Sequence, residues 1–475
     1  MQVSAPVRAS SPRPGVSPSR RRLPILAGEA VRRRDSLSCR YARKERGRLP
    51  HQWERRPFGR SALSNGHQSF TRGETLPRLW IPVFAVQHEG EMTIHIVGGR
   101  ILKGDGSWVE TDLFLHDGRI ARIGSGTGVR EVWDASGLLV LPGIVDLHGD
   151  AFERQIMPRP GVSFPLDLAL LESDRQMAAN GITTAYHGLT WSWEPGLRGR
   201  EVAFAFLDTL ESLNGRLSCD TRVHLRHEIY NLDAVVDILA WVAAGRIHLL
   251  AFNDHLPEFM AKVERPDSLA SYAARAGTTT ADFAALVGEV RQRAERVPES
   301  VEMLAQAARM AGLPMASHDD DSAEIRSWYS GLGCRICEFP VTEEAARCAR
   351  SLGDVTVMGA PNVLRGGSHV GRLDAAAIAG QGLCGILTSD YFYPALLAAP
   401  FRLMTSGRFS LAAAWATVSS NPARAAGLKD RGVIEVGRRA DILLVDAADP
   451  ALPRVVATVV AGRPVHVSEA WRLRV

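Results

Sequence analysis

Lysine and cysteine are both scarce in this chain, and long apolar runs are missing. Of the 475 residues, six are cysteine and four are lysine, namely Lys44, Lys103, Lys262 and Lys429. The cysteines show no paired framework, which excludes a disulfide scaffold and fits a reducing compartment. Cys334 and Cys337 have the spacing of a redox or zinc pair, but no second pair follows, so we interpret them as packing residues. No run approaches the roughly 18 apolar residues that cross a bilayer, and we therefore expect a cytoplasmic protein.

The overall composition is that of a globular protein, but the charged residues are unevenly distributed along the chain. Hydrophobic residues make up 45% and charged residues 23% of the chain, which excludes disordered and collagen-like classes. Residues 1–90 hold 18 Lys and Arg against 6 Asp and Glu, whereas the rest of the chain has an acidic excess. A basic leader suits a transit peptide, a nucleic-acid contact or a membrane contact. Because this one is proline-rich without an apolar period, we interpret residues 1–91 as a disordered extension and expect neither nucleic acid nor membrane as a partner.

The order of apolar runs predicts an α/β barrel. Two ends with short β-like runs, residues 92–140 and 430–475, enclose a middle in which strand-like runs alternate with helical stretches. Alternation of this kind is typical of parallel strands covered by helices. Eight runs favour a closed (β/α)8 barrel over an open sheet. They lie at residues 138–147, 182–187, 221–228, 247–253, 313–317, 337–341, 355–358 and 384–389. The long return between residues 256 and 312 predicts additional helices.

Polar residues at the ends of these runs predict a metal centre. In such a barrel the active-site groups lie at the carboxyl ends of the strands. His148 and Asp150 follow the first run, and strand alternation puts both on one face. Later runs end on further imidazole and carboxylate groups, which are Glu228, His255, His318 and Asp390. Five strand ends thus offer a histidine or a carboxylate, which favours metal ligands over separately buried polar groups.

The ligand types indicate which metal to expect. Imidazole with carboxylate suits Zn²⁺, with Mn²⁺ or Fe²⁺ as alternatives. Six candidates exceed what one tetrahedral ion needs, so we expect one or two divalent ions and a bridging carboxylate. No lysine ends a barrel run, which excludes a carboxylated lysine bridge and leaves Glu228 as the bridging candidate. A metal pair activates water, and we expect Asp390 to be the catalytic residue that orients this water and accepts its proton.

Three segments carry a resemblance to a known family. They are LPGIVDLH at residues 141–148, NPAR at 421–424 and GVIEVGRRAD at 432–441. Through them the chain resembles the amidohydrolase superfamily over residues 92–475. The resemblance implies a metal-dependent barrel hydrolase at residues 141–429, with a composite β-sandwich formed by residues 92–140 and 430–475.

Four more segments resemble one branch of that superfamily. They are HGD at residues 148–150, MPRP at 157–160, ASHDD at 316–320 and PNVLRGGSH at 361–369. The branch belongs to phosphonate catabolism by the carbon–phosphorus lyase pathway and hydrolyses a ribose 1-methylphosphonate 5-triphosphate to the 5-phosphate and pyrophosphate. The resemblance therefore implies a phosphorylated sugar as the small-molecule substrate. The oligomeric state stays open, with a homo-oligomer among the options.

Several polar residues are candidates for phosphate contacts. These substrate-binding candidates are Arg159, Arg226, Asn362, Arg365 and His369. We expect Arg365 and His369 in a glycine-rich loop after the seventh run, where backbone N–H groups can cradle phosphate. Asn362 either donates to a phosphate oxygen or caps that loop.

Two other functions remain open. A C–N hydrolase of the same superfamily, of the deacetylase or D-aminoacylase type, also uses a carboxylate bridge but needs at most one anion-binding group. A binding protein would instead act through residues 1–90.

The roles of two residues near the site also stay open. His187 is a candidate for a hydrogen bond to a metal ligand, and Asp319 is a candidate for such a bond or for a Mg²⁺ contact.

Overall fold

The computed structural model describes residues 93–126, 131–159, 161–368 and 371–474. Residues 1–91, for which a disordered extension is expected, and His369 lie outside this part of the chain. Among the described helices, none combines the length and the apolar character that crossing a membrane requires.

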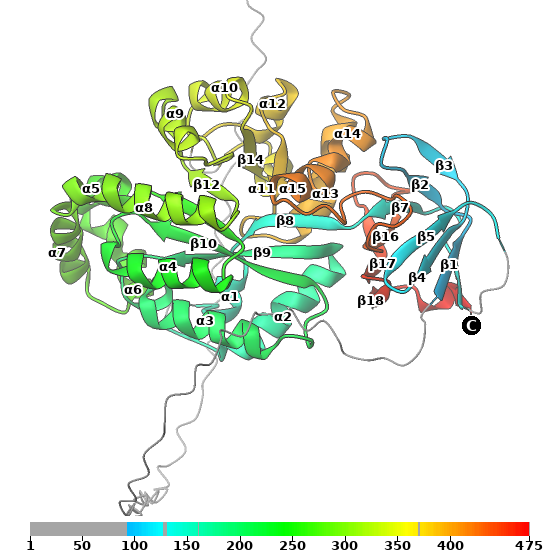
Figure 1. Cartoon of the computed structure of the whole chain (residues 1–475), viewed down its shortest axis with the longest axis horizontal. Coiled ribbons are helices and arrows are strands. Elements are labelled where there is room, and N and C mark those ends of the chain that lie inside the picture. The colour runs from blue at the N-terminus through cyan, green and yellow to red at the C-terminus, as the bar shows by residue number, and fades with distance from the viewer. Residues whose placement is uncertain (1–92, 127–130, 160, 369–370, 475) are drawn as a thin grey trace, which may run out of the picture. The chain divides into compact units, whose positions relative to one another are not determined.

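Eight parallel strands form the barrel, in the continuous order β15 to β8 (Figure 1). They are β8 (Ile144–Gly149), β9 (Ile182–Trp191), β10 (Asp220–Glu228), β11 (Leu249–Asn253), β12 (Met315–His318), β13 (Ile336–Glu338), β14 (Val355–Gly359) and β15 (Ile386–Thr388). The (β/α)8 prediction is therefore confirmed, with one correction. The first predicted run is two strands in different sheets, because the chain leaves β7 (Leu139–Pro142) through Gly143 before it enters β8.

A buried carboxylate fastens the seam between the first and last barrel strands. Asp146 of β8 accepts hydrogen bonds from the Ser389 hydroxyl at 2.5 Å and from the Ser389 N–H at 3.0 Å. Next to it, the Asp390 N–H donates to the His148 carbonyl, and the Asp150 N–H donates to the Asp390 carbonyl, both at 2.9 Å. These bonds close the barrel and bring the candidates of the first and eighth strands side by side.

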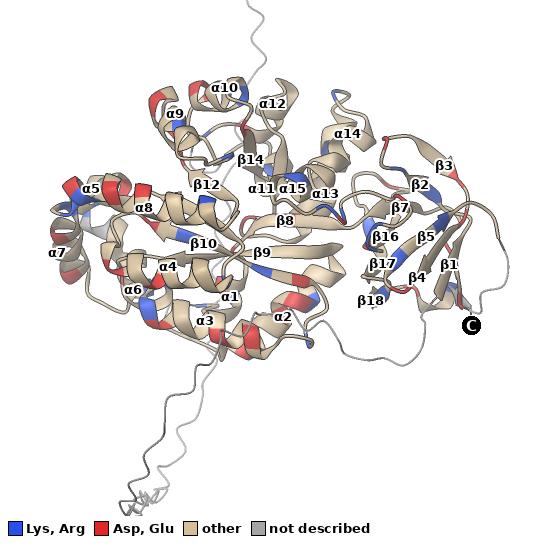
Figure 2. Cartoon of the chain, in the orientation of Figure 1, with Lys and Arg blue, Asp and Glu red and all other residues tan. Residues whose placement is uncertain are grey.

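Helices cover the outside of the barrel, and many of their residues are charged (Figure 2). The returns after the first three strands contain α1 (Phe152–Ile156), α2 (Leu166–Ala179), α3 (Arg200–Ser212) and α4 (Val235–Ala244). The later returns contain α9 (Ala323–Gly331), α10 (Glu343–Ser351), α11 (Ala360–Arg365), α12 (Ala375–Gly380), α13 (Pro394–Thr405), α14 (Leu411–Ala416) and α15 (Ser420–Ala425). Ser322 and Thr342 cap α9 and α10, since each side-chain oxygen accepts a bond from a first-turn N–H.

The long return after β11 folds into the additional helices that its length predicts. They are α5 (Leu256–Val263), α6 (Ala270–Ala276), α7 (Thr280–Arg291) and α8 (Val297–Met310). Phe259 and Phe283 pack with Trp193 of the β9 return in a small apolar core. The insertion is thus anchored to the barrel by its own buried cluster.

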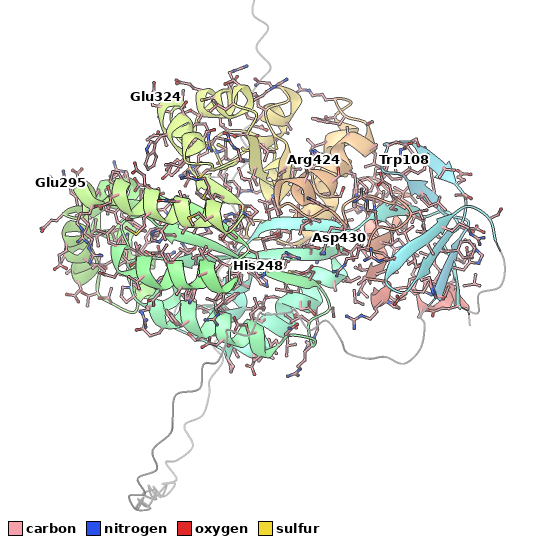
Figure 3. The ribbon with its side chains drawn as sticks, in the orientation of Figure 1. Trp108, His248, Glu295, Glu324, Arg424 and Asp430 are labelled. Atoms are coloured by element: carbon pink, nitrogen blue, oxygen red, sulfur yellow. The ribbon has the colours of Figure 1, made fainter. Side chains whose placement is uncertain are left out.

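Both ends of the described chain build one composite β-sandwich. One sheet contains β1 (Thr93–Val97), β4 (Leu113–His116), β5 (Arg119–Ile123), β6 (Glu131–Asp134) and β19 (Leu473–Arg474). The other contains β2 (Arg100–Leu102), β3 (Trp108–Glu110), β7, β16 (Ile442–Asp446), β17 (Arg454–Val460) and β18 (Arg463–Val467). The ends join where β16 pairs with β7 and β19 pairs with β6. The chain returns to the sandwich through Arg424 and Asp430, which Figure 3 labels.

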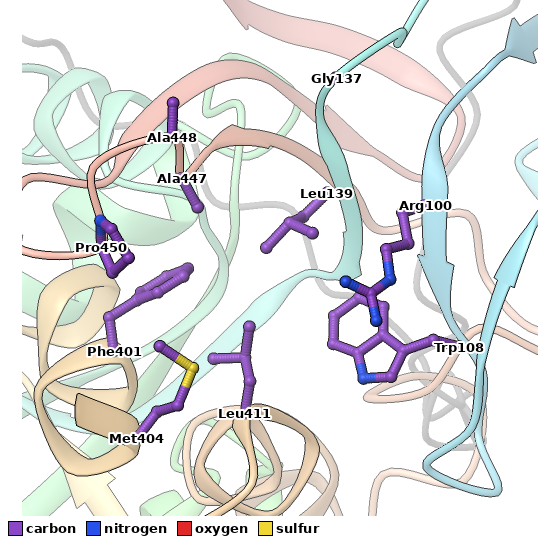
Figure 4. Close-up of a pocket in the computed structure, with 10 residues that line it drawn as sticks. All are labelled: Arg100, Trp108, Gly137, Leu139, Phe401, Met404, Leu411, Ala447, Ala448 and Pro450. Carbon is purple, nitrogen blue, oxygen red and sulfur yellow. The ribbon is translucent and has the colours of Figure 1, made fainter. Parts of the chain in front are cut away.

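An open cavity of about 380 Å³ lies between the sandwich and α13 (Figure 4). Trp108 forms one wall, with the Arg100 guanidinium 4.9 Å from its ring centroid. Phe401 and Met404 form the wall from α13. None of the candidate site residues lines this cavity, so it is separate from the chemistry described below.

Candidate active site

The inside of the barrel changes from apolar to polar along its strands. Val145, Leu249, Ile336 and Val357 belong to a buried apolar cluster inside the barrel. On β13, Glu338 lies two residues beyond Ile336 and therefore faces the same way. The polar groups begin at this level, at the carboxyl ends of the strands, which is where they are expected.

Three buried donor groups meet at this level. His148, His318 and Glu338 each offer one ligand atom, and these atoms lie within 4.8 Å of one another. His148 Nδ1 is 3.3 Å from Glu338 Oε2, and His224 Nε2 is 3.5 Å from the same oxygen. All four side chains are less than a tenth exposed. Neither Glu338 nor His224 was predicted from the sequence, although His224 shares its strand face with Glu228.

A second donor group shares His318 with the first. His255, His318 and Asp319 also offer ligand atoms within 4.8 Å of one another. Asp319 Oδ2 lies 3.4 Å from His255 Nε2 and 3.1 Å from His318 Nδ1. Behind this group, His255 Nδ1 and Glu228 Oε1 form a hydrogen bond of 2.5 Å. Because the two groups share His318, they form one continuous set of donor atoms, which we call the donor set. Its residues come from β8, β12 and β13 and from the returns after β11 and β12.

The donor set fits a divalent cation. Among the described residues, His224 Nε2 and Glu338 Oε1 are buried atoms without a hydrogen-bond partner. Such atoms are costly to bury unless a ligand satisfies them. Nitrogen and carboxylate oxygen donors are the ligands that Zn²⁺ takes in proteins, and two groups sharing one histidine suit one or two ions.

Comparisons with known proteins find relatives of this chain. A family model described as Amidohydrolase family matches residues 396–466. The chain is also 32% identical over 348 residues to alpha-D-ribose 1-methylphosphonate 5-triphosphate diphosphatase of Escherichia coli (strain K12), and the match covers 72% of this chain and 89% of that protein. The chain belongs to the amidohydrolase family.

Two further proteins match this chain at lower identity. The chain is 25% identical over 417 residues to a dihydroorotase of Geobacter sp. (strain M21), a match that covers 75% of this chain and 90% of that one. The solved 5-methylcytosine deaminase of Klebsiella pneumoniae has a TM-score of 0.55 at 15% identity, with 79% of this chain and 98% of that chain covered. The second likeness shows a common fold.

Electrostatics in this amidohydrolase site favour the metal-binding protonation state of His148, His224 and Asp319, whereas His255 has to lose a proton before it can bind a metal. Burial lowers the pKa of His148 well below its ordinary range and that of His224 to about 3, which keeps both imidazoles neutral. Burial works to raise the pKa of Asp319, but His318 and His255 hold it well below its ordinary value. Burial also opposes the charged form of His255, yet the Glu228 and Asp319 carboxylates raise its pKa to about 9. Neutral imidazole and ionised carboxylate are the forms that bind metal.

The other two predicted ligands lie beside these groups. Asp150 Oδ2 is 3.4 Å from Arg226 Nη1, while Arg226 Nη2 is 3.3 Å from His318 Nε2. Burial, reinforced by the charge of Asp150, raises the pKa of Asp390 to about 8. A Cβ atom at Gly359 would lie 3.2 Å from Asp390 Oδ2, so this glycine leaves room for the carboxylate. All six predicted ligands therefore lie at one end of the barrel.

The predicted substrate contacts are distributed differently. Arg226 is buried inside the donor set, whereas Arg159 is exposed in the turn after α1. Arg365 is the last residue of helix α11 rather than part of a loop, and Gly366 ends that helix with a φ of 74°. Asn362 donates to the Leu373 carbonyl and accepts from a backbone N–H, each at 2.9 Å, which favours the loop-capping alternative for this residue.

His187 does not approach the donor set. Its ring packs edge-on against Phe152 at 5.0 Å and Phe206 at 5.8 Å, measured between ring centroids. Phe152 and Phe206 belong to the apolar layer between barrel and helices. The neighbouring Gly188 faces inward instead, where a Cβ would lie 3.3 Å from Arg226 Cδ and 3.6 Å from His148.

Proposed function

We propose that this amidohydrolase is a metal-dependent diphosphatase that converts α-D-ribose 1-methylphosphonate 5-triphosphate to the 5-phosphate and pyrophosphate. The observation that carries the proposal is the 32% identity, over 89% of its length, to a protein that bears this activity in its name. Arg226 beside the donor set, with Arg159 and Arg365 exposed among the returns of the neighbouring strands, supports it, because a triphosphate needs several cations.

The residues that would hold the metal are His148, His318 and Glu338 in one group and His255, His318 and Asp319 in the other. When bound, divalent ions supply Lewis-acid chemistry that activates water and neutralises phosphoryl charge. Glu228 orients His255 through their hydrogen bond. Arg226 sets the direction of Asp150 and neutralises part of its charge.

Asp390 is the proton acceptor in this proposal, because the positive charge of a bound divalent ion would favour its ionised form. The oxygen of water forms a bond to the α-phosphorus, and one proton of that water passes to the Asp390 carboxylate. The bond from the α-phosphorus to the bridging oxygen breaks, and this oxygen leaves with its electron pair as part of pyrophosphate. Cations near the leaving group stabilise the charge that develops on it.

The experiment is direct. Purified protein is incubated with Zn²⁺ or Mn²⁺ and the ribose triphosphate, and products are followed by phosphorus NMR. Stoichiometric pyrophosphate and 5-phosphate are expected. Release of orthophosphate alone, or no reaction with either metal, would contradict the proposal.

A C–N hydrolase, of the deacetylase or D-aminoacylase type, is the second candidate. Its support is the 25% identity to a dihydroorotase over 90% of that protein. Such an enzyme acts on substrates with few negative charges, so a panel of N-acyl amino acids and cyclic amides under the same metal conditions separates the two candidates.

A further inference from the structure

Two arginines from separate segments contact one tyrosine beside the candidate active site. Arg154 Cζ lies 5.2 Å from the ring centroid of Tyr391. Arg365 Nη1 donates to the Tyr391 hydroxyl at 3.5 Å. Tyr391 directly follows Asp390 in the chain. Neither Arg154 nor Tyr391 was predicted from the sequence to have a role.

Barrel closure brings these three residues together. Arg365 follows β14, Tyr391 follows β15 and Arg154 follows β8. β15 pairs with β14 on one side and meets β8 through the Gly149–Asp390 bridge on the other. Tyr391 therefore follows the middle one of three adjacent strands, and each of the two neighbouring strands is followed by one of the arginines.

Neither of these two arginines forms an ion pair with a carboxylate of the described residues, although Arg154 lies near enough to Asp390 for an electrostatic attraction. Other arginines near the barrel mouth are paired, as Arg198 is with Glu153 at 2.9 Å and Arg226 is with Asp150. Within the described part of the chain, neither Arg154 nor Arg365 has a carboxylate oxygen within 4.0 Å of its guanidinium nitrogens. Two exposed cations that contact one tyrosine, one over its ring and one at its hydroxyl, raise the local positive potential, which attracts a polyanion.

We propose that Arg154, Tyr391 and Arg365 bind the two outer phosphoryl groups of the substrate, the part that leaves as pyrophosphate. This inference rests on the proposed function and specifies which side of the site holds the leaving group. The Asp390 N–H donates to the carbonyl of His148, a member of the donor set, and the next residue is Tyr391, so an α-phosphorus beside Asp390 puts the outer phosphates within reach of the two arginines. Guanidinium groups bind phosphate oxygens through paired charge-assisted hydrogen bonds. The site therefore selects a 5-triphosphate over a 5-monophosphate.

Binding of inorganic pyrophosphate to the full-length, metal-loaded protein tests the site without turnover. Arg154→Gln and Arg365→Gln are each expected to weaken pyrophosphate binding roughly 10-fold or more, because each removes a charge-assisted contact. Binding of ribose 5-phosphate should change less than about threefold. Arg175→Gln is the matched control, since Arg175 is an exposed arginine on α2 whose partner is Glu172. Isothermal titration calorimetry measures all four proteins.

Tyr391 variants test the geometry of the cluster. Tyr391→Phe retains the ring under Arg154 and removes only the hydroxyl that Arg365 contacts, so it should weaken pyrophosphate binding less than Tyr391→Ala does. Equal losses in both variants would show that the ring does not position Arg154. Metal content is measured for every variant. If the metal content is unchanged, weaker pyrophosphate binding results from the lost anion contacts and not from a disturbed donor set.

The outcomes separate this inference from the proposed function. If the wild type releases pyrophosphate from the triphosphate but the arginine variants keep its kcat/KM and pyrophosphate affinity, the inference is wrong and the function stands. If no triphosphate is cleaved yet both arginine variants lose pyrophosphate binding, the anion site stands and the function is wrong. A wild type that does not bind pyrophosphate would overturn the site itself.

Discussion

His148 Nδ1 and Glu338 Oε2 lie 3.3 Å apart, although 190 positions separate them in the sequence. His148 is near the end of the first barrel strand and Glu338 ends the sixth. Their contact crosses the inside of the barrel and joins an imidazole to a carboxylate that is fully buried. A buried carboxylate in this position needs a cation or hydrogen bonds, and its Oε1 atom has no hydrogen-bond partner among the described residues.

Glu338→Gln is therefore expected to weaken metal binding. The change preserves shape but removes the negative charge of the first donor group, so affinity should fall at least roughly 10- to 100-fold. Competition with a chromophoric chelator measures the affinity. Glu324→Gln, at an exposed position of α9, is the control. Wild-type affinity in Glu338→Gln would remove Glu338 from the donor set.

Glu338 also shows where prediction from sequence stops. The order of apolar runs predicts all eight barrel strands, because burial on both faces leaves continuous apolar segments. Strand ends are less well determined. The sixth run extends to Val341 by composition, but β13 ends at Glu338, after which Phe339 adopts a φ of 50° and Pro340 offers no N–H group. Because the predicted strand end was three residues too late, Glu338 was not recognised as the carboxylate at the end of the strand.

His224 was missed for a different reason. It lies on the same face as Arg226 and Glu228 but deeper in the strand, where a polar residue is ordinarily satisfied within the core. Only the neighbouring strands show that its ring faces Glu338. The approach of Arg154 to Tyr391 likewise depends on the closure between β15 and β8, which no local pattern contains.

Asp390→Asn is expected to separate metal binding from catalysis. The amide cannot accept the proton of the attacking water, so kcat should fall by roughly 10² to 10⁴. Most of the metal should remain, since the two donor groups do not include Asp390. Metal analysis beside steady-state kinetics checks both parts. Glu228→Ala is the comparison that should lose metal, because it removes the hydrogen-bond partner that orients His255. Full activity in Asp390→Asn would disprove the assignment.

Asn253→Leu is expected to stabilise the protein and impair it as an enzyme. Asn253 is fully buried at the end of β11, in register with Glu228 and His318, and neither of its amide atoms has a hydrogen-bond partner among the described residues. Leucine has a similar volume and removes this unsatisfied amide, which should raise the free energy of unfolding of metal-free protein by about 1 kcal/mol. Urea titration measures the gain, and kcat/KM measures the loss. A destabilised Asn253→Leu would indicate a structural role instead.

His187 should make stability sensitive to mild acid. Burial lowers its pKa to about 4 in the folded protein, whereas an unfolded histidine titrates near 6.5. Between these values the unfolded chain binds the extra proton, so stability is complete above about pH 6.5 and declines as pH falls toward about 4. At pH 5 this group alone costs about 2 kcal/mol. In His187→Phe, which keeps a ring between Phe152 and Phe206, the difference in unfolding free energy between pH 7.5 and pH 5 should shrink by that amount, as measured by urea titration. His187→Leu is a second variant, made because the larger phenylalanine ring can fit the site poorly. An unchanged pH dependence in both variants would mean that His187 titrates normally in the folded protein.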